Sequence, residues 1–179
     1  MIHPTANVDP NARIWRAVKI GPFSEIGPLA DIGDGTSVIG GIVEGVVGRN
    51  CKIWRGAHVW QGAKVGDNCM LAQNVMVARA TVGNNVRIQN NTSIPHHAVI
   101  ENNVYIGACV SLCNSVHPSA VTEDTLHQIT LKEGCSIGSN VCIIGDVTIG
   151  ANASVGAGAV VTSDVPDGVT VVGIPAKQI

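Results

Sequence analysis

The stretch VRIQNNTSIPHHAVIENNVYI, residues 86–106, decides the fold. Ile88, Ile94, Ile100 and Ile106 stand six residues apart within it. A period of six matches neither the 3.6-residue turn of an α-helix nor the simple alternation of a half-buried strand. It indicates a repeating structural unit, which has to be traced along the whole chain before any single element is assigned.

The spacing of six extends over most of the chain in four runs. The aliphatic residues of these runs are Val8, Ile14, Ile20, Ile26, Ile32, Val38; Val47, Ile53, Val59, Val65, Leu71, Val77; Val82, Ile88, Ile94, Ile100, Ile106, Leu112; and Leu131, Ile137, Ile143, Ile149, Val155, Val161. A small or β-branched residue usually stands two positions earlier, and Gly often follows. The pattern predicts short strands and Gly-containing turns that alternate along a solenoid, with the aliphatic side chains inside.

The pattern resembles known left-handed parallel β-helices, in which three hexads close one triangular coil. Successive coils then stack at the ordinary strand spacing of roughly 4.8 Å. We expect an all-β fold of about eight coils that forms a single domain over residues 1–179. Low aromatic content (3%) and 21 Gly also favour a repetitive β-structure.

The breaks in the repeat are expected to mark loops, which often carry function. The apolar break at 39–48 reads as a bulged turn. Between Leu112 and Leu131 we expect a loop near 113–130 that leaves the coil and holds His117, Glu123, Asp124 and His127. The tail 162–179 is expected to fold over the last coil and cover its edge.

Composition narrows the partners and the compartment. The net charge is −2 and no basic patch dominates, so nucleic acid is not an expected partner. The first residues lack the charged and apolar regions of a signal peptide, and no apolar run reaches the roughly 20 residues of a membrane helix. We expect a cytoplasmic protein without a membrane partner. Its six Cys should be free thiols, with Cys51, Cys69 and Cys135 packed inside the coil.

Several segments in order resemble the hexapeptide-repeat acyltransferases, and within them the bacterial nucleotide-sugar 3-N-acetyltransferases. They are HPTA (3–6), IWRGAHV (53–59), AQNVMVA (72–78), VRIQNNTSI (86–94), the loop after Leu112, GAGAVV (156–161) and GIPAKQI (173–179). The resemblance implies transfer of an acetyl group from acetyl-CoA, without a metal, to an amino sugar linked to UDP or dTDP. It also implies a homotrimer with active sites between neighbouring subunits.

Two site positions carry over from this resemblance. The family's loop opens with Phe-Thr-Asn, and here Leu112-Cys113-Asn114 keeps only the Asn, which orients the reacting amine in the family. His96 stands eighteen residues earlier, where the family usually has an acidic residue. Eighteen residues make one coil, so the period itself predicts that His96 and Asn114 lie on adjacent coils at the same wall.

The chemistry of acyl transfer suggests roles for these residues. An amine attacks the thioester carbonyl and a thiolate leaves, so a His with a pKa near 6.5 can remove the amine's proton. We assign His96 as the base and Asn114 as the orienting residue. The alternatives left open are a substrate-contact role for His96, since some of these enzymes use no protein base, a surface role, and replacement by its neighbour His97.

The remaining candidates are assigned by residue type. Amides on neighbouring coils suit a nucleobase and sugar hydroxyls, or a turn-forming role: Gln73, Asn74, Gln89, Asn90 and Asn91. Arg79 is a candidate for the diphosphate, and His97 for substrate contact. For CoA we expect the backbone of Gly138, Ala157 and Ala159, with Lys177 at a phosphate.

Three other functions remain open. NSVHPSA resembles the loop of maltose and galactoside O-acetyltransferases, which makes His117 a candidate base for a sugar hydroxyl. A γ-type carbonic anhydrase shares the fold, but its paired His ligands five residues apart are missing, since residue 122 is Thr. A non-catalytic β-helix would keep the same repeat.

Overall fold

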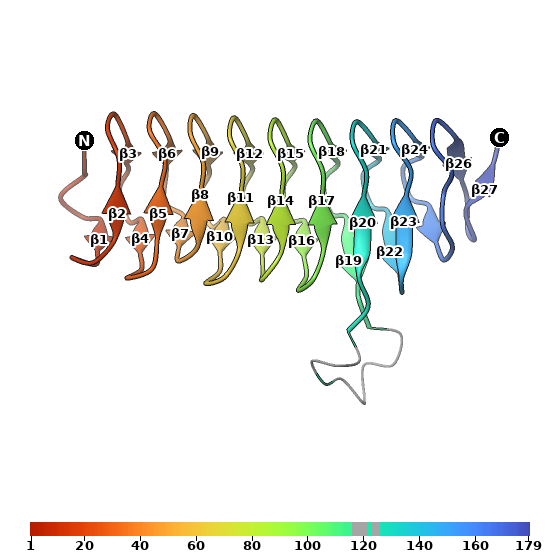
Figure 1. The fold of residues 1–179 in the computed structure, drawn as a ribbon, viewed down its shortest axis with the longest axis horizontal. Helices are drawn as coiled ribbons and strands as arrows, with labels where there is room; N and C mark the ends of the chain where they lie inside the picture. The colour runs from red at the N-terminus through yellow and green to blue at the C-terminus, as the bar shows by residue number, and fades with distance from the viewer. Residues whose placement is uncertain (116–121, 123–125) are drawn as a thin grey trace.

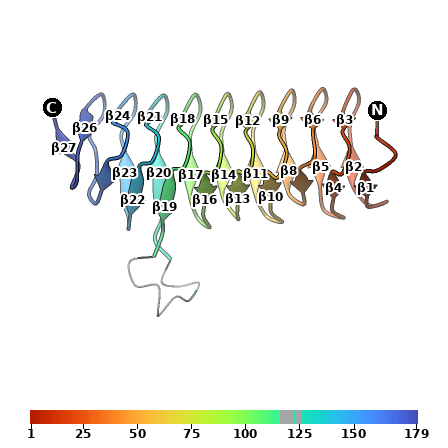
Figure 2. The same ribbon diagram turned by 180° about the vertical axis from the view of Figure 1, so that it is seen from behind.

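A computed structural model describes residues 1–115, 122 and 126–179, so His117, Glu123 and Asp124 lie outside the described residues. The described chain is an all-β, left-handed parallel β-helix, as the hexad predicts (Figure 1). Its coils are stacked along one long axis, and the two termini lie at opposite ends (Figure 2).

Three sheets form the faces of the triangular shaft, and each receives every third strand of the chain. Sheet 1 contains β1 (Asn7–Val8), β4 (Glu25–Ile26), β7 (Ile42–Val43), β10 (His58–Val59), β13 (Met76–Val77), β16 (Ser93–Ile94), β19 (Ser111–Cys113), β22 (Cys142–Ile144) and β25 (Val160–Val161). Sheet 2 contains β2 (Arg13–Ile14), β5 (Asp31–Ile32), β8 (Val46–Val47), β11 (Lys64–Val65), β14 (Thr81–Val82), β17 (Val99–Ile100), β20 (Ile129–Leu131) and β23 (Val147–Ile149). Sheet 3 contains β3 (Lys19–Ile20), β6 (Ser37–Val38), β9 (Lys52–Ile53), β12 (Met70–Leu71), β15 (Arg87–Ile88), β18 (Tyr105–Ile106), β21 (Ser136–Ile137), β24 (Ser154–Val155), β26 (Thr170–Val172) and β27 (Lys177–Gln178). The chain turns from sheet 1 to 2, 2 to 3 and 3 to 1, and these turns are called the 1/2, 2/3 and 3/1 corners.

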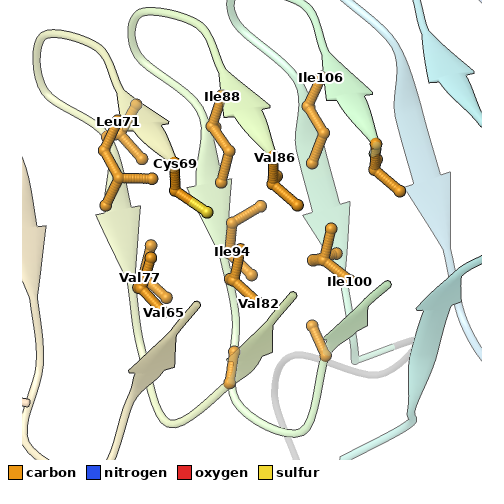
Figure 3. Close-up of a cluster of buried hydrophobic side chains, with 14 of the residues drawn as sticks. Val65, Cys69, Leu71, Val77, Val82, Val86, Ile88, Ile94, Ile100 and Ile106 are labelled. Atoms are coloured by element: carbon orange, nitrogen blue, oxygen red, sulfur yellow. The ribbon is translucent and has the colours of Figure 1, made fainter. Parts of the chain in front are cut away.

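The inward aliphatic column forms the core. In most two-residue strands the first side chain faces out and the second, such as Ile88 or Ile94, is fully buried. Figure 3 shows side chains from all three faces meeting along the axis. The register pairs like with like, so that Ile88 lies between Leu71 and Ile106 on neighbouring coils. Identical inward positions therefore stack on one another, which is why the hexad has to be kept.

The break at 39–48 is a compressed coil, which corrects the expectation of a bulged turn. Val43 is completely buried and forms an inward position between Val38 and Val47. The 3/1 corner before β7 and the 1/2 corner after it are short, so the hexad is lost although the strand is kept. Sheet 1 consequently has nine strands, one more than the eight coils expected.

Corners are stabilised by residues that suit tight turns. Eight Asn adopt a positive φ at corners, for example Asn85 at 58° and Asn103 at 60°. Other corner side chains cap the coil above or below, as when Asn102 Oδ1 accepts a hydrogen bond from the Asn84 N–H at 2.8 Å. At the 2/3 corner the coils stack closely through glycines, and a Cβ on Gly48 would lie 2.6 Å from the carbonyl carbon of Gly66.

The irregular spacings concentrate at the 1/2 corner. There the inward residues are separated by four positions from Val43 to Val47 and by five from Val77 to Val82, and the chain leaves the coil between β19 and β20. The base of this excursion is closed by the His127 N–H, which donates to the Asn114 carbonyl at 2.7 Å. The 1/2 corner is therefore the edge of the shaft at which the structure departs most from the repeat.

The C-terminal tail first continues the coil and then covers it. Val165 forms a bridge with Ile149, and β26 pairs in parallel with β24, so both segments add inward positions. Strand β27 turns back and pairs antiparallel with β26 at the edge of sheet 3. No helix among the described residues has the length and apolar character to cross a membrane.

Candidate functional site

A cavity of about 430 Å³ lies at the 1/2 corner, beside the base of the excursion. Its walls are formed by Trp60, Met76, Ala78, Pro95, His96, Asn114, Thr122 and Leu126. Most of these side chains present carbon, and polar groups come from His96, Asn114 and Thr122. The cavity thus joins a largely apolar wall to a small number of polar groups, as binding sites commonly do.

The recess has a local cause in the sequence. The corners after β10 and β16 each have four residues between strands, whereas the corner after β13 has only three, 78–80. The Ala80 N–H donates back to the Ala78 carbonyl at 2.6 Å, which tightens this corner. With Ala78 as the small side chain in the middle, the coil is recessed between its larger neighbours Trp60 and Pro95.

His96 and Asn114 lie together on adjacent coils. The Asn114 Nδ2 donates a hydrogen bond to the backbone carbonyl of His96 at 3.0 Å, across a separation of 18 residues. Both residues line the cavity. The period placed the two at one wall, and the structure has them there.

The imidazole of His96 is half-buried, and its Nδ1 atom is buried without a hydrogen-bond partner among the described residues. His96 and His97 occupy the turn between β16 and β17 instead of a strand, so strand alternation does not decide which of them faces the cavity. His97 has a φ of 63° and is exposed, and the cavity lining includes only His96 of the two. The turn geometry therefore favours His96 over its rival.

A row of rings runs along the wall of the cavity. The Trp60 ring packs against His96 with centroids 6.2 Å apart in an edge-to-face arrangement. The Trp60 ring also contacts His58, with centroids 5.5 Å apart. His58 Nε2 lies 2.9 Å from a carboxylate oxygen of Glu44, one coil nearer the N-terminus. These three residues were missed in the sequence, although the register places position 60 beside 78 and 95 on the following coils.

The expected nucleotide-binding amides lie on another edge of the shaft. Gln73, Asn74, Gln89, Asn90 and Asn91 occupy the 3/1 corner, on the opposite side of sheet 1 from His96. Asn74 and Asn91 adopt positive φ and bond to each other at 3.0 Å, and Asn90 Oδ1 accepts from the Gln73 N–H at 3.3 Å. Turn formation thus accounts for these three Asn. Gln73 and Gln89 line a shallow hollow with Trp54.

Arg79 belongs to the same 1/2 corner as His96, and its carbonyl accepts the His97 N–H at 3.1 Å. Its side-chain carbons lie close to Gly62, where a Cβ would come within 3.3 Å of Arg79 Cγ. The structure therefore brings Arg79, His96, His97 and Asn114 to one edge of the shaft.

The residues expected to contact CoA lie near the C-terminal end. Gly138 and Ala157 stack at the 3/1 corner, and Lys177 is exposed on β27. Ala159 is buried inside the shaft, its N–H bonded to the Gly156 carbonyl and its carbonyl to the Cys142 N–H. Gly138 uses its N–H for the Val155 carbonyl. Of the four, Ala157 and Lys177 are the exposed ones.

The cysteines divide into two groups. Cys51, Cys69 and Cys135 are buried in the shaft, as the inward column predicts. Burial raises the pKa of Cys135 to about 12. Cys113 and Cys142 lie on the outer face of sheet 1 with their sulfurs 3.7 Å apart, and burial, followed by this contact, raises the pKa of Cys142 to about 11. No group of three or more His, Cys, Asp or Glu able to hold a metal occurs among the described residues.

The triangular shaft and its hexads define a hexapeptide-repeat β-helix. The chain belongs to the bacterial transferase hexapeptide family, whose six-repeat pattern matches residues 45–79, 79–114 and 129–163.

Two curated relatives share part of the chain. A Schizosaccharomyces pombe protein named as an acetyltransferase is 41% identical over 86 residues, which cover 45% of this chain and 41% of that protein. The 2,3,4,5-tetrahydropyridine-2,6-dicarboxylate N-acetyltransferase of Staphylococcus aureus is 38% identical over 77 residues, or 43% of this chain and 30% of the relative. The chain therefore matches less than half the length of these relatives.

Solved structures extend the comparison. A UDP-N-acetylglucosamine acyltransferase of Bacteroides fragilis superposes on 100% of this chain and 74% of its own with a TM-score of 0.86; at 22% identity it shows the shared fold. A galactoside acetyltransferase in complex with coenzyme A is 30% identical over 66% of this chain and 64% of its own, with a TM-score of 0.58.

Proposed function

We propose that this chain transfers the acetyl group of acetyl-CoA to the amine of an amino sugar linked to UDP or dTDP. The observation that carries the proposal is the cavity lined by both His96 and Asn114, in which the Asn114 amide is bonded to the His96 backbone carbonyl across adjacent coils. Membership of a transferase family and the acetyltransferase names of the relatives support the reaction class.

In this proposal His96 accepts the proton that the amine loses as its nitrogen attacks the thioester carbonyl. The Asn114 amide orients the amine, because its bond to the His96 carbonyl fixes the side chain. Backbone N–H groups stabilise the oxyanion of the tetrahedral intermediate. The C–S bond then breaks, and the CoA thiolate receives the proton.

We further propose that three copies of this chain assemble with a site at each subunit boundary. The arrangement in one chain supports this, because the amide-rich 3/1 corner and the His96 corner flank opposite sides of sheet 1. A neighbouring subunit would supply the second corner to each site, with CoA running towards Ala157 and Lys177. Such an assembly gives a particle three times the 18.5 kDa chain mass. A chain that stays monomeric in light scattering contradicts the shared site.

The activity is tested with a panel of UDP- and dTDP-linked amino sugars, followed by thiol release from acetyl-CoA. Acetylation of at least one linked amino sugar is expected, and the product is checked by mass spectrometry. Turnover of unlinked sugar alcohols alone would reject the proposal.

A sugar O-acetyltransferase that uses His117 is the second candidate. The similarity to a galactoside acetyltransferase favours it. A hydroxyl is a much weaker acid than an ammonium group, so this reaction needs a base throughout the pH range. The comparison of His117→Ala with His96→Ala on amine and alcohol acceptors separates the two functions.

A further inference from the structure

We propose that Trp60 is the surface on which the carbohydrate ring of the acceptor packs, and that His58 and Glu44 hold its indole in position. The proposal deepens the function given above and rests on it. To the site defined by His96 and Asn114, it adds a third residue, which determines how the acceptor binds.

The position of Trp60 is unusual for so large an apolar side chain. Trp60 lines the cavity and keeps 39% of its surface exposed. It lies outside the shaft, whereas the fully buried aliphatic side chains point into it. A large ring left half-open beside polar groups is a common way to bind a ligand that has one apolar face.

The indole contacts two imidazole rings. His96 meets it edge-to-face, with ring planes at 74°, and His58 packs against it in a tilted arrangement at 41°. His58 is itself held by Glu44 at 2.9 Å, and the short corner after β7 places Glu44 there. A chain of contacts from Glu44 to His96 therefore sets the angle of the Trp60 ring against the proposed base.

The rest of the lining matches a sugar ring better than a phosphate. Met76, Ala78, Pro95 and Leu126 add carbon surface, and the lining among the described residues contains no Lys or Arg. A pyranose has a C–H face that packs on an aromatic ring and an edge of polar groups. With the C–H face on Trp60, that edge is directed to His96 and Asn114, where the amine has to react.

The chain supplies its own control. Its three tryptophans lie at three different corners: Trp15 at 2/3, Trp54 at 3/1 and Trp60 at 1/2. Trp15 is also exposed (54%), but its indole N–H bonds to Asp31 at 2.8 Å on the N-terminal coils, away from the cavity. Trp15→Phe therefore removes an exposed indole of the same kind without touching the site.

The kinetic test compares Trp60→Ala, Trp60→Phe and Trp15→Phe on the amino sugar that the wild type acetylates. Loss of one aromatic packing surface should raise the KM for the acceptor roughly five- to tenfold in Trp60→Ala and less in Trp60→Phe. The KM for acetyl-CoA should not change. Trp15→Phe should match the wild type in both KM values.

The binding test needs no turnover. The same acceptor, added without acetyl-CoA, should quench the emission of a Trp15→Phe/Trp54→Phe variant, in which Trp60 is the single tryptophan that remains. UDP or dTDP alone should leave the Trp60 emission unchanged.

The role of His58 and Glu44 is tested with His58→Ala in a Trp15→Phe/Trp54→Phe background. The anisotropy of the Trp60 emission should fall, because the indole loses a contact that holds it. The KM for the acceptor should rise, whereas kcat should be unchanged. Glu44→Gln retains an acceptor oxygen and should stay near the wild type.

Three results overturn the proposal while the proposed function survives. One is an unchanged acceptor KM in Trp60→Ala. Another is quenching of Trp60 emission by the nucleotide alone, which would mean that the indole packs against the nucleobase. The third concerns butanoyl-CoA, an acyl donor with a longer chain. If Trp60→Ala raises the KM for this donor and leaves the KM for the acceptor unchanged, the cavity holds the acyl group. If the wild type acetylates no amino sugar in the panel, the proposed function fails and this inference fails with it.

Discussion

The side-chain amide of Asn114 donates to the backbone carbonyl of His96 at 3.0 Å, and this bond links two coils directly after β19. The Asn114 carbonyl at the same time accepts the His127 N–H at 2.7 Å, where the chain returns towards the shaft. One residue therefore fastens the base of the excursion and the corner that carries the proposed base.

Replacing Asn114 should affect both stability and catalysis. Asn114→Ala removes the hydrogen bond to His96, at a cost of about 1 kcal/mol, and should lower the Tm slightly. It should lower kcat more than it raises the KM for acetyl-CoA, because Asn114 orients the amine in the proposed mechanism. Thermal unfolding and steady-state kinetics measure the two effects. An Asn114→Ala enzyme with unchanged kcat would show that the amide serves the fold alone.

Replacing His96 should separate catalysis from stability. His96→Ala removes a ring whose buried Nδ1 satisfies no hydrogen bond in the described chain, so the Tm should hardly fall. Loss of a general base should lower kcat by about 10²- to 10⁴-fold near neutral pH, with partial recovery as the pH rises and more amine loses its proton unaided. His3→Ala, on the first coil, is the control. Full turnover across the pH range would instead place His96 among the substrate contacts.

Acid should weaken one contact between coils in a predictable way. Arg49 donates to Asp67 through its side chain, at 2.7 and 3.0 Å, and through its backbone N–H, and these bonds hold the pKa of Asp67 below its usual value. Because the folded pKa is depressed, the stabilisation is present above the unfolded pKa of about 4 and is lost as the pH falls through the folded value. The Tm difference between the wild type and Asp67→Asn should therefore be largest near pH 7 and shrink towards pH 3. A difference that grows in acid contradicts this sign. Asp146→Asn, at an exposed corner, controls for the loss of charge.

Thiol reactivity should report the interior of the shaft. Alkylation needs the thiolate, so the exposed Cys109 should react first in the folded protein. Cys142 should react slowly at pH 8, because its pKa is raised to about 11. The hydrogen bond with Cys51, and then burial, raise the pKa of Cys69 far above its usual range, and Cys135 is fully buried, so both should stay unlabelled until urea unfolds the chain. Peptide mapping after iodoacetamide gives the order. Rapid native labelling of Cys69 would mean that the inward column is assigned wrongly.

The close stacking at the 2/3 corner should not tolerate a methyl group. In Gly48→Ala the new Cβ would lie 2.6 Å from the Gly66 carbonyl carbon, and the backbone of the next coil has to move. Overpacking of this kind costs about 1–3 kcal/mol, which denaturant unfolding can measure. Gly27→Ala is the matched change, since its Cβ first meets the flexible Glu44 Cγ at 3.2 Å. Equal stability of the two variants would contradict the stacking.

The sequence predicts the shaft well because each inward position is specified by its own side chain. Ile88, Ile94 and Ile100 need only the period to be assigned to three faces, and the structure has them on sheets 3, 1 and 2. The same period put His96 beside Asn114. What depends on spacing alone can therefore be predicted from this sequence.

Corner lengths and ring contacts do not follow from the period. Val43 was hidden because two short corners removed the hexad around it, and the period alone does not show that His96 and His97 form a turn. The amides of Gln73 and Asn90 are close to His96 in sequence but lie at another corner, since a few residues suffice to pass from one edge of the triangle to the next. Trp60 was missed because its role depends on neighbours from two other coils.

Changes of length at the 1/2 corner alter the shape of the cavity and leave the shaft in register. The three-residue turn at 78–80 makes room between Trp60 and Pro95, yet Val77 and Val82 still pair with the same inward positions above and below. Under the proposed function, insertion or deletion of single residues along this edge would reshape the acceptor cavity while the inward side chains keep their register. A test of other acceptors would therefore begin with an exchange of turns along this edge.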